Sequence, residues 1–272
     1  RMLDPYTESV LIFTGINIVV ALGLYLPVSA GLLSLGQGGF MAIGAYTAAY
    51  LTTELQWPFV VALLCGGVMA GLVGFVVGLP SLRIKGIYLV IMTMGFGEIV
   101  RVFFLNFEPT GAASGLGGIT THTTLPVVAT AVALTLLLCF QIRGSRIGRA
   151  IEAVREDELA AEVIGINLTY VKVAVFGLGA AIAGIGGGLY AHYATFIDPA
   201  QFGFQRSAEI FIMVVLGGMG NYAGAAIGAV VVTVLPEVLR LGHAQEWRMT
   251  VFGALLVAIM IVRPWGLLGV RR

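Results

Sequence analysis

The stretch GSRIGRAIEAVREDELAAEVIGINLTYVK, residues 144–172, decides how the rest of this sequence is interpreted. With the preceding Arg143 it forms the only long charged segment in a chain of 272 residues, of which 58% are hydrophobic and 11% are charged. Its apolar residues recur at spacings of three, four or seven: Ile147, Ile151, Val154 and Ala161. A helix gathers residues at these spacings on one face, so we expect a water-exposed helix between two apolar parts of the chain.

Long runs without any charged residue lie on both sides of this segment. They cover residues 9–53, 55–82, 109–142, 173–197 and 210–236. A helix needs roughly 20 apolar residues to cross the hydrocarbon core, so the runs predict an all-α, polytopic transmembrane helical bundle with about eight or nine membrane elements, some short or broken. A β-barrel would show alternating apolar and polar residues in segments of about ten, and this sequence has no such alternation.

Several classes of function are disfavoured by what the sequence lacks. Cys65 and Cys139 lie inside apolar runs and fit buried free thiols, and no Cys/His cluster predicts a metal, so we expect no metal or cofactor. A net charge of +1 without a basic run gives no indication of nucleic-acid binding. No GxxxxGK[ST], HExxH or Ser/His/Asp grouping occurs, so we expect a protein that is not an enzyme and has no ATP site of its own.

Two glycine-rich interruptions divide apolar segments. The first, SAGLLSLGQGG at 29–39, follows a predicted span at 9–26 and precedes an apolar segment at 40–53. Irregular backbone at membrane depth needs cover from protein or a water-filled cavity, so two interpretations are open: a place near a substrate path, or a plain turn at the membrane face. The second, GGMGNYAG at 217–224, divides residues 210–239, and here we expect a hairpin of two short elements.

The distribution of Lys and Arg predicts the orientation of the chain. Ten of these residues fall in 80–85, in the charged segment and after residue 262, against four in the other connections. The basic segments are therefore expected inside the cell and the N-terminus outside. A hairpin at 217–224, followed by a last span at 247–262, keeps the basic tail inside, whereas a single crossing there would not.

Few polar side chains lie within the predicted spans. Glu98 and Arg101 are three residues apart in the span at 87–107 and share a helix face. Charges within spans usually pair and face the bundle interior, so this pair is either part of a polar path or a self-satisfied structural pair, and the second is favoured. The side chains that we expect along a translocation path are weakly polar or acidic: Ser34, Gln37, Thr93, Glu98, Glu209 and Asn221.

Four segments, taken in order, resemble a known family. They are AGLLSLGQGGFMAIGAYTAAYL (30–51), LRIKGIYLVIMTMGFGEIVR (82–101), GRAIEAVREDELAAEVIGIN (148–167) and GLYAHYATFIDPAQFGFQRSAEIFIMVVLGGMGNYAGAAIGAVVV (188–232), followed by RPWGLLG near the C-terminus. This set is similar to the LivM-type permeases of branched-chain amino-acid ABC importers. The resemblance implies a type II-like ABC importer fold, with residues 1–272 forming a single transmembrane permease domain. It also implies a LivH-type partner permease, two cytoplasmic ATPase subunits, a periplasmic substrate-binding protein, and a multi-pass location in the lipid bilayer of a bacterial inner membrane.

In that family, the loop that matches 143–169 inserts a short coupling helix into a cleft on an ATPase. The resemblance implies that the contact is made by Arg149, Ala150, Glu152, Ala153, Arg155 and Glu156, and that Gly165 ends the element. An amphipathic helix with charges of both signs on its outer side can dock in a groove, although a merely solvated surface helix is the alternative. The sequence departs from the typical Glu-Ala-Ala pattern, because it has Glu152-Ala153-Val154.

The resemblance implies import of branched-chain or related amino acids, driven by separate ATPases. Similar permeases carry urea, short-chain amides or aromatic acids, and this sequence does not separate these substrates. The residues alone also allow two other classes of membrane transport protein to be considered. An ion-coupled secondary transporter needs intramembrane carboxylates and often shows inverted repeats; only Glu98 and Glu209 qualify. A channel needs rings of polar groups and leaves the charged segment without a role.

Overall fold

The computed structural model describes residues 4–81, 84, 86–241, 253, 257 and 266–268. In this part of the chain, five helices are long and apolar enough to cross a membrane. They are α1 (Pro5–Ser29), α3 (Phe59–Ser81), α4 (Ile87–Asn106), α5 (Leu125–Gly144) and α8 (Leu168–Ala194). Three further helices lie among them: α2 (Gln37–Thr53), α9 (Phe204–Gly217) and α10 (Tyr222–Leu241). The prediction of an all-α polytopic bundle is confirmed.

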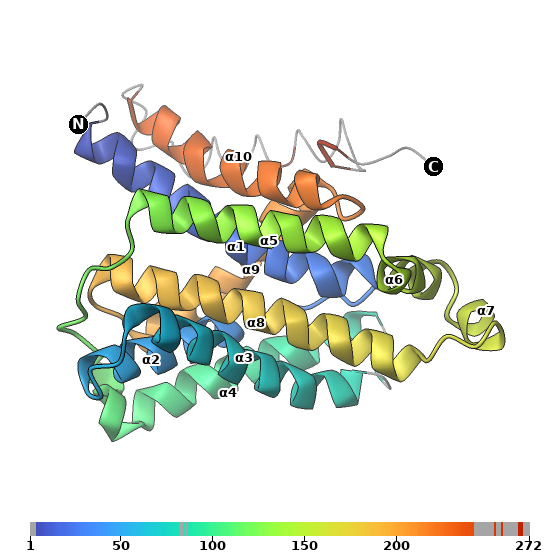
Figure 1. Ribbon diagram of the computed structural model, residues 1–272, viewed down its shortest axis with the longest axis horizontal. Coiled ribbons are helices and arrows are strands. Elements are labelled where there is room, and N and C mark those ends of the chain that lie inside the picture. Colours follow the sequence, from blue (N-terminus) through green and yellow to red (C-terminus); the bar gives the residue numbers. More distant parts are fainter. Residues whose placement is uncertain are drawn as a thin grey trace.

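The remaining short elements lie at the two ends of the bundle (Figure 1). The charged segment folds into α6 (Arg146–Glu156) and α7 (Glu158–Val163), which project together from one end. The 3-10 turns η1 (Glu108–Thr110), η2 (Ala112–Ser114) and η3 (Pro199–Phe202) lie at the other end. There, the isolated bridge between Leu116 and Ile197 joins the two long connections.

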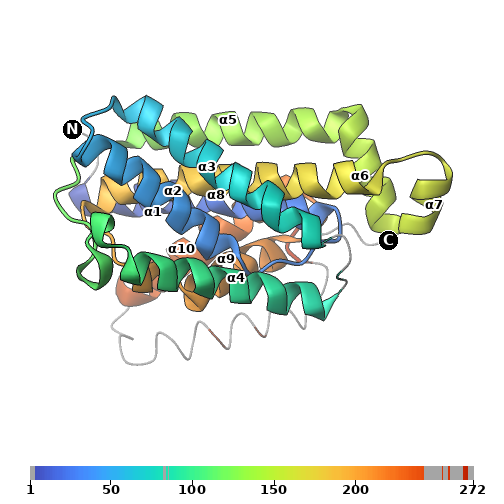
Figure 2. The ribbon, with the colours of Figure 1, turned by 90° about the horizontal axis from the view of Figure 1, so that it is seen from below.

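Helix α8 is the centre of the bundle, with α1, α2 and α3 packed around it (Figure 2). Its run GLGAAIAGIGGGLYA, residues 177–191, explains this position, because small residues let helix backbones approach closely in a membrane. A Cβ on Gly44 of α2 would lie 2.1 Å from the carbonyl oxygen of Gly184 on α8. The α2–α8 contact is therefore made backbone against backbone.

The first interruption is shorter than the sequence predicts. Helix α1 continues through Pro27 to Ser29, and α2 begins at Gln37, so only 30–36 is irregular. The helix ending is formed by the two residues after Ala30. Gly31 has φ +80°, and the N–H groups of Gly31 and Leu32 donate to the carbonyls of Val28 and Pro27. A left-handed glycine with this pair of bonds is a common helix ending, and it determines the boundary where the proline does not.

The second interruption is a tight turn between two helices, and the predicted hairpin is confirmed. Helices α9 and α10 pack on each other, and a Cβ on Gly217 would lie only 1.9 Å from the carbonyl oxygen of Gly224. The N–H groups of Leu267 and Leu268 donate to the carbonyls of Leu216 and Gly217, at 2.9 and 3.1 Å. This part of the C-terminal segment therefore lies at the same end of the bundle as the turn.

The end of the bundle that carries α6 and α7 also holds four described arginines: Arg143, Arg146, Arg149 and Arg155. We call it the basic end. The predicted span at 247–262 lies outside the described residues except for Gly253 and Val257. So do several basic residues used for the orientation: Arg1, Arg83, Lys85, Arg248, Arg263, Arg271 and Arg272.

Candidate functional site

The charged segment forms two helices instead of one continuous helix. At Asp157 the backbone becomes extended, with φ −154° and ψ 111°, and its Oδ1 accepts hydrogen bonds from the N–H groups of Leu159 and Ala160 at 2.9 and 3.1 Å. Asp157 is thus the N-cap of α7, a role that short acidic side chains favour. Helix α7 ends at Val163, and Gly165, which has φ +89°, follows two residues later.

The predicted apolar face of the segment is correct at three of its four positions. Ile151, Val154 and Ala161 are buried, but 44% of Ile147 is exposed, so that assignment was wrong. The reason lies in the neighbouring Gly148, which faces the end of α5. A Cβ on Gly148 would lie 2.2 Å from the Ile142 carbonyl oxygen, and this close approach turns Ile147 outward.

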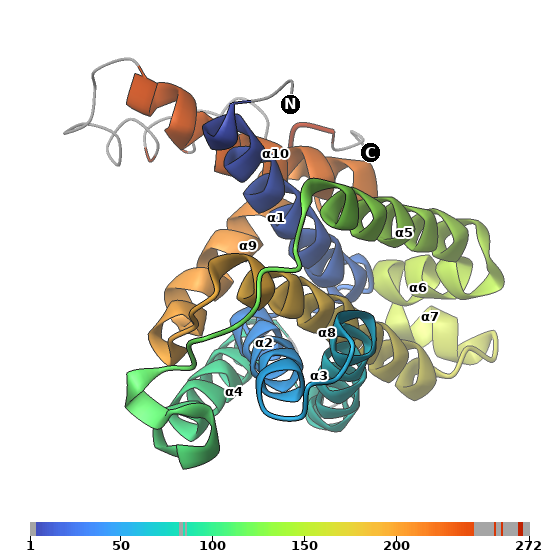
Figure 3. The same ribbon diagram turned by 60° about the vertical axis from the view of Figure 1, so that its left-hand side comes forward.

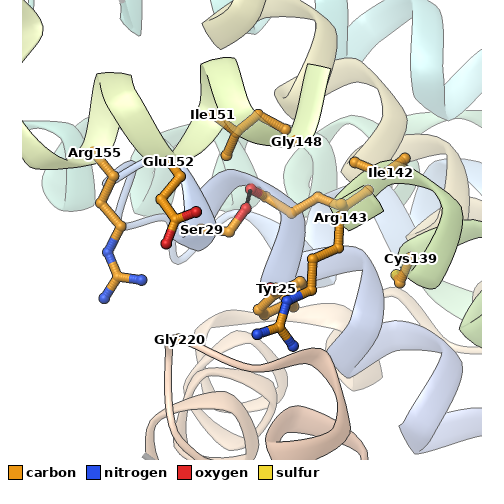
Figure 4. A pocket seen from close by; sticks show the side chains of 11 residues that line it. Tyr25, Ser29, Cys139, Ile142, Arg143, Gly148, Ile151, Glu152, Arg155 and Gly220 are labelled. Carbon is orange, nitrogen blue, oxygen red and sulfur yellow. Dashed lines mark hydrogen bonds between the residues drawn. The ribbon is translucent and has the colours of Figure 1, made fainter. Parts of the chain in front are cut away.

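The six residues predicted to contact an ATPase point in three directions. Ala150 and Ala153 are half-buried and pack against the hydrophobic core. Arg149 and Glu156 are exposed, on the side of α6 away from the buried Val154. The other two, Glu152 and Arg155, line a pocket of about 70 Å³ between α6 and the ends of α1 and α5 (Figure 4).

Arg155, which lines this pocket, places α6 next to both glycine-rich interruptions. A Cβ on Gly31, in the first interruption, would lie 4.0 Å from the Cα of Arg155. A Cβ on Gly220, in the second, would lie 3.7 Å from Nη1 of the same arginine. Close by, Arg143 donates to the Asn221 Oδ1 at 3.3 Å, and its guanidinium lies 5.9 Å from the centre of the Tyr222 ring. A rigid movement of α6 would therefore act on both interruptions.

Helix α7 exposes a set of apolar residues that the sequence analysis missed. The exposed fractions are 74% for Leu159, 87% for Val163 and 73% for Ile164; we call these three residues the α7 patch. The helix beneath them is held by an ion pair of 2.7 Å between Glu158 and Lys172 of α8, and only 3% of the lysine side chain is exposed. The spacing of four between Leu159 and Val163 was the available signal, but it resembles that of a helix packed on a core.

Three of the predicted path residues lie at the first interruption, and all three are buried. Ser34 and Gln37 belong to it, and Thr93 contacts it from α4. The Thr93 Oγ1 accepts a hydrogen bond of 2.9 Å from the Leu35 N–H. The Gln37 Nε2 donates to the Gly179 carbonyl at 3.3 Å, and the Ser34 Oγ accepts from the Gly36 N–H at 3.2 Å. These side chains hold the irregular backbone in place between α4 and α8.

The other three path candidates lie elsewhere. Glu98 pairs with Arg101 at 2.7 Å and also accepts a hydrogen bond from the Phe204 N–H, at the first residue of α9. Glu209 pairs with Arg206 of its own helix at 3.2 Å. Asn221 is at the basic end, next to Arg143. The six candidates thus fall into three regions of this chain, which are the first interruption, the α4–α9 surface and the basic end, and their role in translocation stays a prediction.

Comparison with known proteins identifies the family. A family model described as the permease component of branched-chain amino acid transport systems matches residues 6–260. This chain belongs to that family. The permease is 36% identical to the high-affinity branched-chain amino acid transport system permease protein LivM of Escherichia coli K12 over 307 aligned residues, covering 100% of this chain and 72% of the relative.

Two further relatives come from Salmonella typhimurium LT2. The permease is 37% identical to LivM of that organism, covering 95% of this chain and 69% of the relative. It is 36% identical to LivH of the same organism over 151 residues, covering 56% of this chain and 48% of the relative. No solved structure matches this chain significantly. The family and the long apolar helices together describe a multi-pass membrane permease.

Proposed function

We propose that this chain is one of two membrane-spanning permease subunits of an ATP-binding-cassette importer in a bacterial inner membrane. The importer carries branched-chain or related amino acids. A periplasmic protein delivers the substrate, a LivH-type permease forms the other half of the passage, and two ATPase subunits bind on the cytoplasmic side. The observation that carries the proposal is similarity over the whole chain to a permease of that transport system.

The basic end of the bundle is the cytoplasmic end in this proposal. Lys and Arg accumulate in cytoplasmic connections of membrane proteins, and four arginines lie there on or beside α6. The hairpin of α9 and α10 supports the same orientation, because it leaves residues 266–268 at this end.

The ATPase docks on α6 and α7. Outside the membrane, a group of large apolar side chains exposed by more than 70% marks an interaction surface, and the α7 patch meets this description. Arg149 and Glu156 on α6 are also exposed and add charges of both signs, and an amphipathic helix of this kind can dock in a groove.

The ATPase cycle acts on the passage through α6. Closure of the ATPases moves α6, which contacts the first interruption at Gly31 and the second at Gly220. The first interruption is bonded to Thr93 of α4, so the displacement reaches a helix that carries a membrane-depth charge pair. A rigid-body transition between two packed arrangements of this kind is a known switching mechanism.

Uptake by the reconstituted complex tests the proposal. The permease is purified with its partner permease, ATPases and binding protein and placed in proteoliposomes, and entry of labelled leucine is measured with and without ATP. We expect ATP-dependent uptake, and none with an ATPase variant that binds but does not hydrolyse ATP. ATP-independent uptake, or a permease that never co-purifies with ATPase subunits, would contradict the proposal.

A further inference from the structure

The membrane helices expose faces of two different kinds. Helix α3 has no charged residue between Phe59 and Ser81, and many large apolar side chains are exposed on it, including Val60, Leu64, Leu72 and Val76. Helix α5 also has no charged residue between Leu125 and Ile142, and its exposed side chains include Leu134, Leu137 and Phe140. Faces of this composition are suited to contact with lipid chains.

The face formed by α4 and α9 differs from these two. On α4, the exposed stripe Ile87, Ile91 and Val102 also contains Glu98, whose side chain is 36% exposed and pairs with Arg101. On α9, the side chain of Glu209 is 49% exposed. Both carboxylates therefore lie on the surface of this chain, Glu98 within the membrane-spanning helix α4 and Glu209 on α9, which packs beside it.

The charge pairs of the two helices belong to one continuous surface. Glu98 accepts a hydrogen bond of 3.2 Å from the Phe204 N–H, which ties α4 to the start of α9. A Cβ on Gly203 would lie 3.4 Å from the Arg101 Cδ, so the other member of the pair packs there too. On α9, Arg206 pairs with Glu209 and donates to the Asn17 Oδ1 of α1 at 2.6 Å. Figure 3 shows α9 between α4 and α10 on one side of the molecule.

Lipid is a poor cover for this surface. Ionisable side chains within the hydrocarbon region are costly, and in membrane proteins they face other protein segments or a water-filled cavity. Water alone is also a poor neighbour for this face, because the side chains of Ile87, Ile91 and Val102 around Glu98 are apolar and between 47% and 69% exposed. Another membrane protein that presents apolar residues together with hydrogen-bond donors satisfies both requirements.

We infer that the α4–α9 face is the surface on which the second permease subunit of the importer packs, with the passage for the solute between the two subunits at the level of Glu98 and Glu209. The inference rests on the proposed function, which supplies the second permease. The partner surface has to offer hydrogen-bond donors opposite the two carboxylates, set among apolar side chains that cover Ile91 and Val102. By contrast, α3 and α5 face the lipid.

Photo-crosslinking in the complete importer tests the assignment. A photoreactive phenylalanine analogue replaces Ile91 or Val102 on α4, and in matched controls it replaces Leu72 on α3 or Leu137 on α5. We expect the α4 positions to crosslink to the second permease at a yield about tenfold above that of the control positions. Equal yields, or crosslinks to the second permease from α3 or α5 alone, would overturn the inference.

A larger side chain at the inferred interface provides an independent test, in which recovery of the second permease is measured. Ile91→Trp should reduce recovery of the second permease with the tagged chain about tenfold, because a packed interface does not accommodate a larger side chain. Leu72→Trp should leave recovery unchanged, because lipid chains rearrange around it. Unchanged recovery for Ile91→Trp would count against the interface. Leucine uptake by the unsubstituted complex is measured in parallel, so a failed proposed function is distinguished from a misplaced interface.

Discussion

Trimming the α7 patch should weaken binding of the ATPase subunit without disturbing the membrane bundle. Burial of each methylene-sized group contributes about 0.8 kcal/mol. Leu159→Ala removes three carbons from a residue that is 74% exposed before docking, so the loss is about 1.8 kcal/mol, roughly a 20-fold weaker Kd. Val163→Ala removes two carbons from a residue that is 87% exposed, and about 1.4 kcal/mol, or tenfold, is expected.

The assay is a binding titration between the purified ATPase subunit and the two permeases in nanodiscs, followed by leucine uptake. Leu134→Ala is the matched control, because this leucine is 66% exposed on the membrane-spanning helix α5 and lies outside the charged segment. We expect wild-type affinity for the control and unchanged thermal unfolding for all three variants. If Leu159→Ala and Val163→Ala both bind the ATPase with wild-type affinity, the α7 patch does not dock there and the argument from its exposure is refuted.

Three other substitutions probe contacts inside the chain. Gly44→Ala should lower stability by about 3 kcal/mol, because its Cβ would meet the Gly184 backbone. Gly95→Ala is the control and should be neutral, because its Cβ would meet nothing within 4 Å. Thermal unfolding in detergent compares the two variants. Thr93→Val should cost about 1–2 kcal/mol by leaving the Leu35 N–H without its acceptor, and Thr93→Ser should restore stability in the same measurement. Asp157→Ala should cost α7 about 1 kcal/mol, seen as faster amide exchange in that helix, and an equal exchange rate in the variant and the wild type would argue against the cap.

The arrangement around α6 gives the coupling mechanism that we propose a specific geometry. Arg155 lies next to both interruptions, one of which starts at the end of α1 while the other joins α9 to α10. Each interruption is a point where a membrane helix ends next to α6, so each can change direction without breaking a regular helix. A helix that contacts both of them can move the two halves of the chain together.

Much of the architecture follows from local sequence properties. The apolar runs predicted α1, α3, α4, α5 and α8 because hydrophobic length alone determines whether a helix can span a membrane. The turn at 217–224 was predictable because a second signal, the distribution of basic residues, required an additional crossing. The predicted span at 9–26 ended too early, because α1 continues to Ser29 and its ending depends on the bonds around Gly31.

The candidate site was only partly predictable. The charged segment was predicted to lie outside the apolar bundle, because charged residues in a membrane protein collect in its aqueous connections, and it does project from one end of the bundle. Its division at Asp157 was missed, since the apolar spacing continues across that residue. The outward position of Ile147 was missed because it depends on the contact between Gly148 and α5.

By itself, the sequence determined that this is a helical membrane protein with one large charged connection, because hydrophobicity and charge act through residues close together in the chain. Only the tertiary structure decided which of its polar groups meet. Glu98 binds the start of α9 across 106 positions of sequence, and Arg143 binds Asn221 across 78. Such contacts depend on how the helices pack. The run of small residues in α8 shows that another helix can approach it closely, but only the tertiary structure shows that Gly184 meets Gly44.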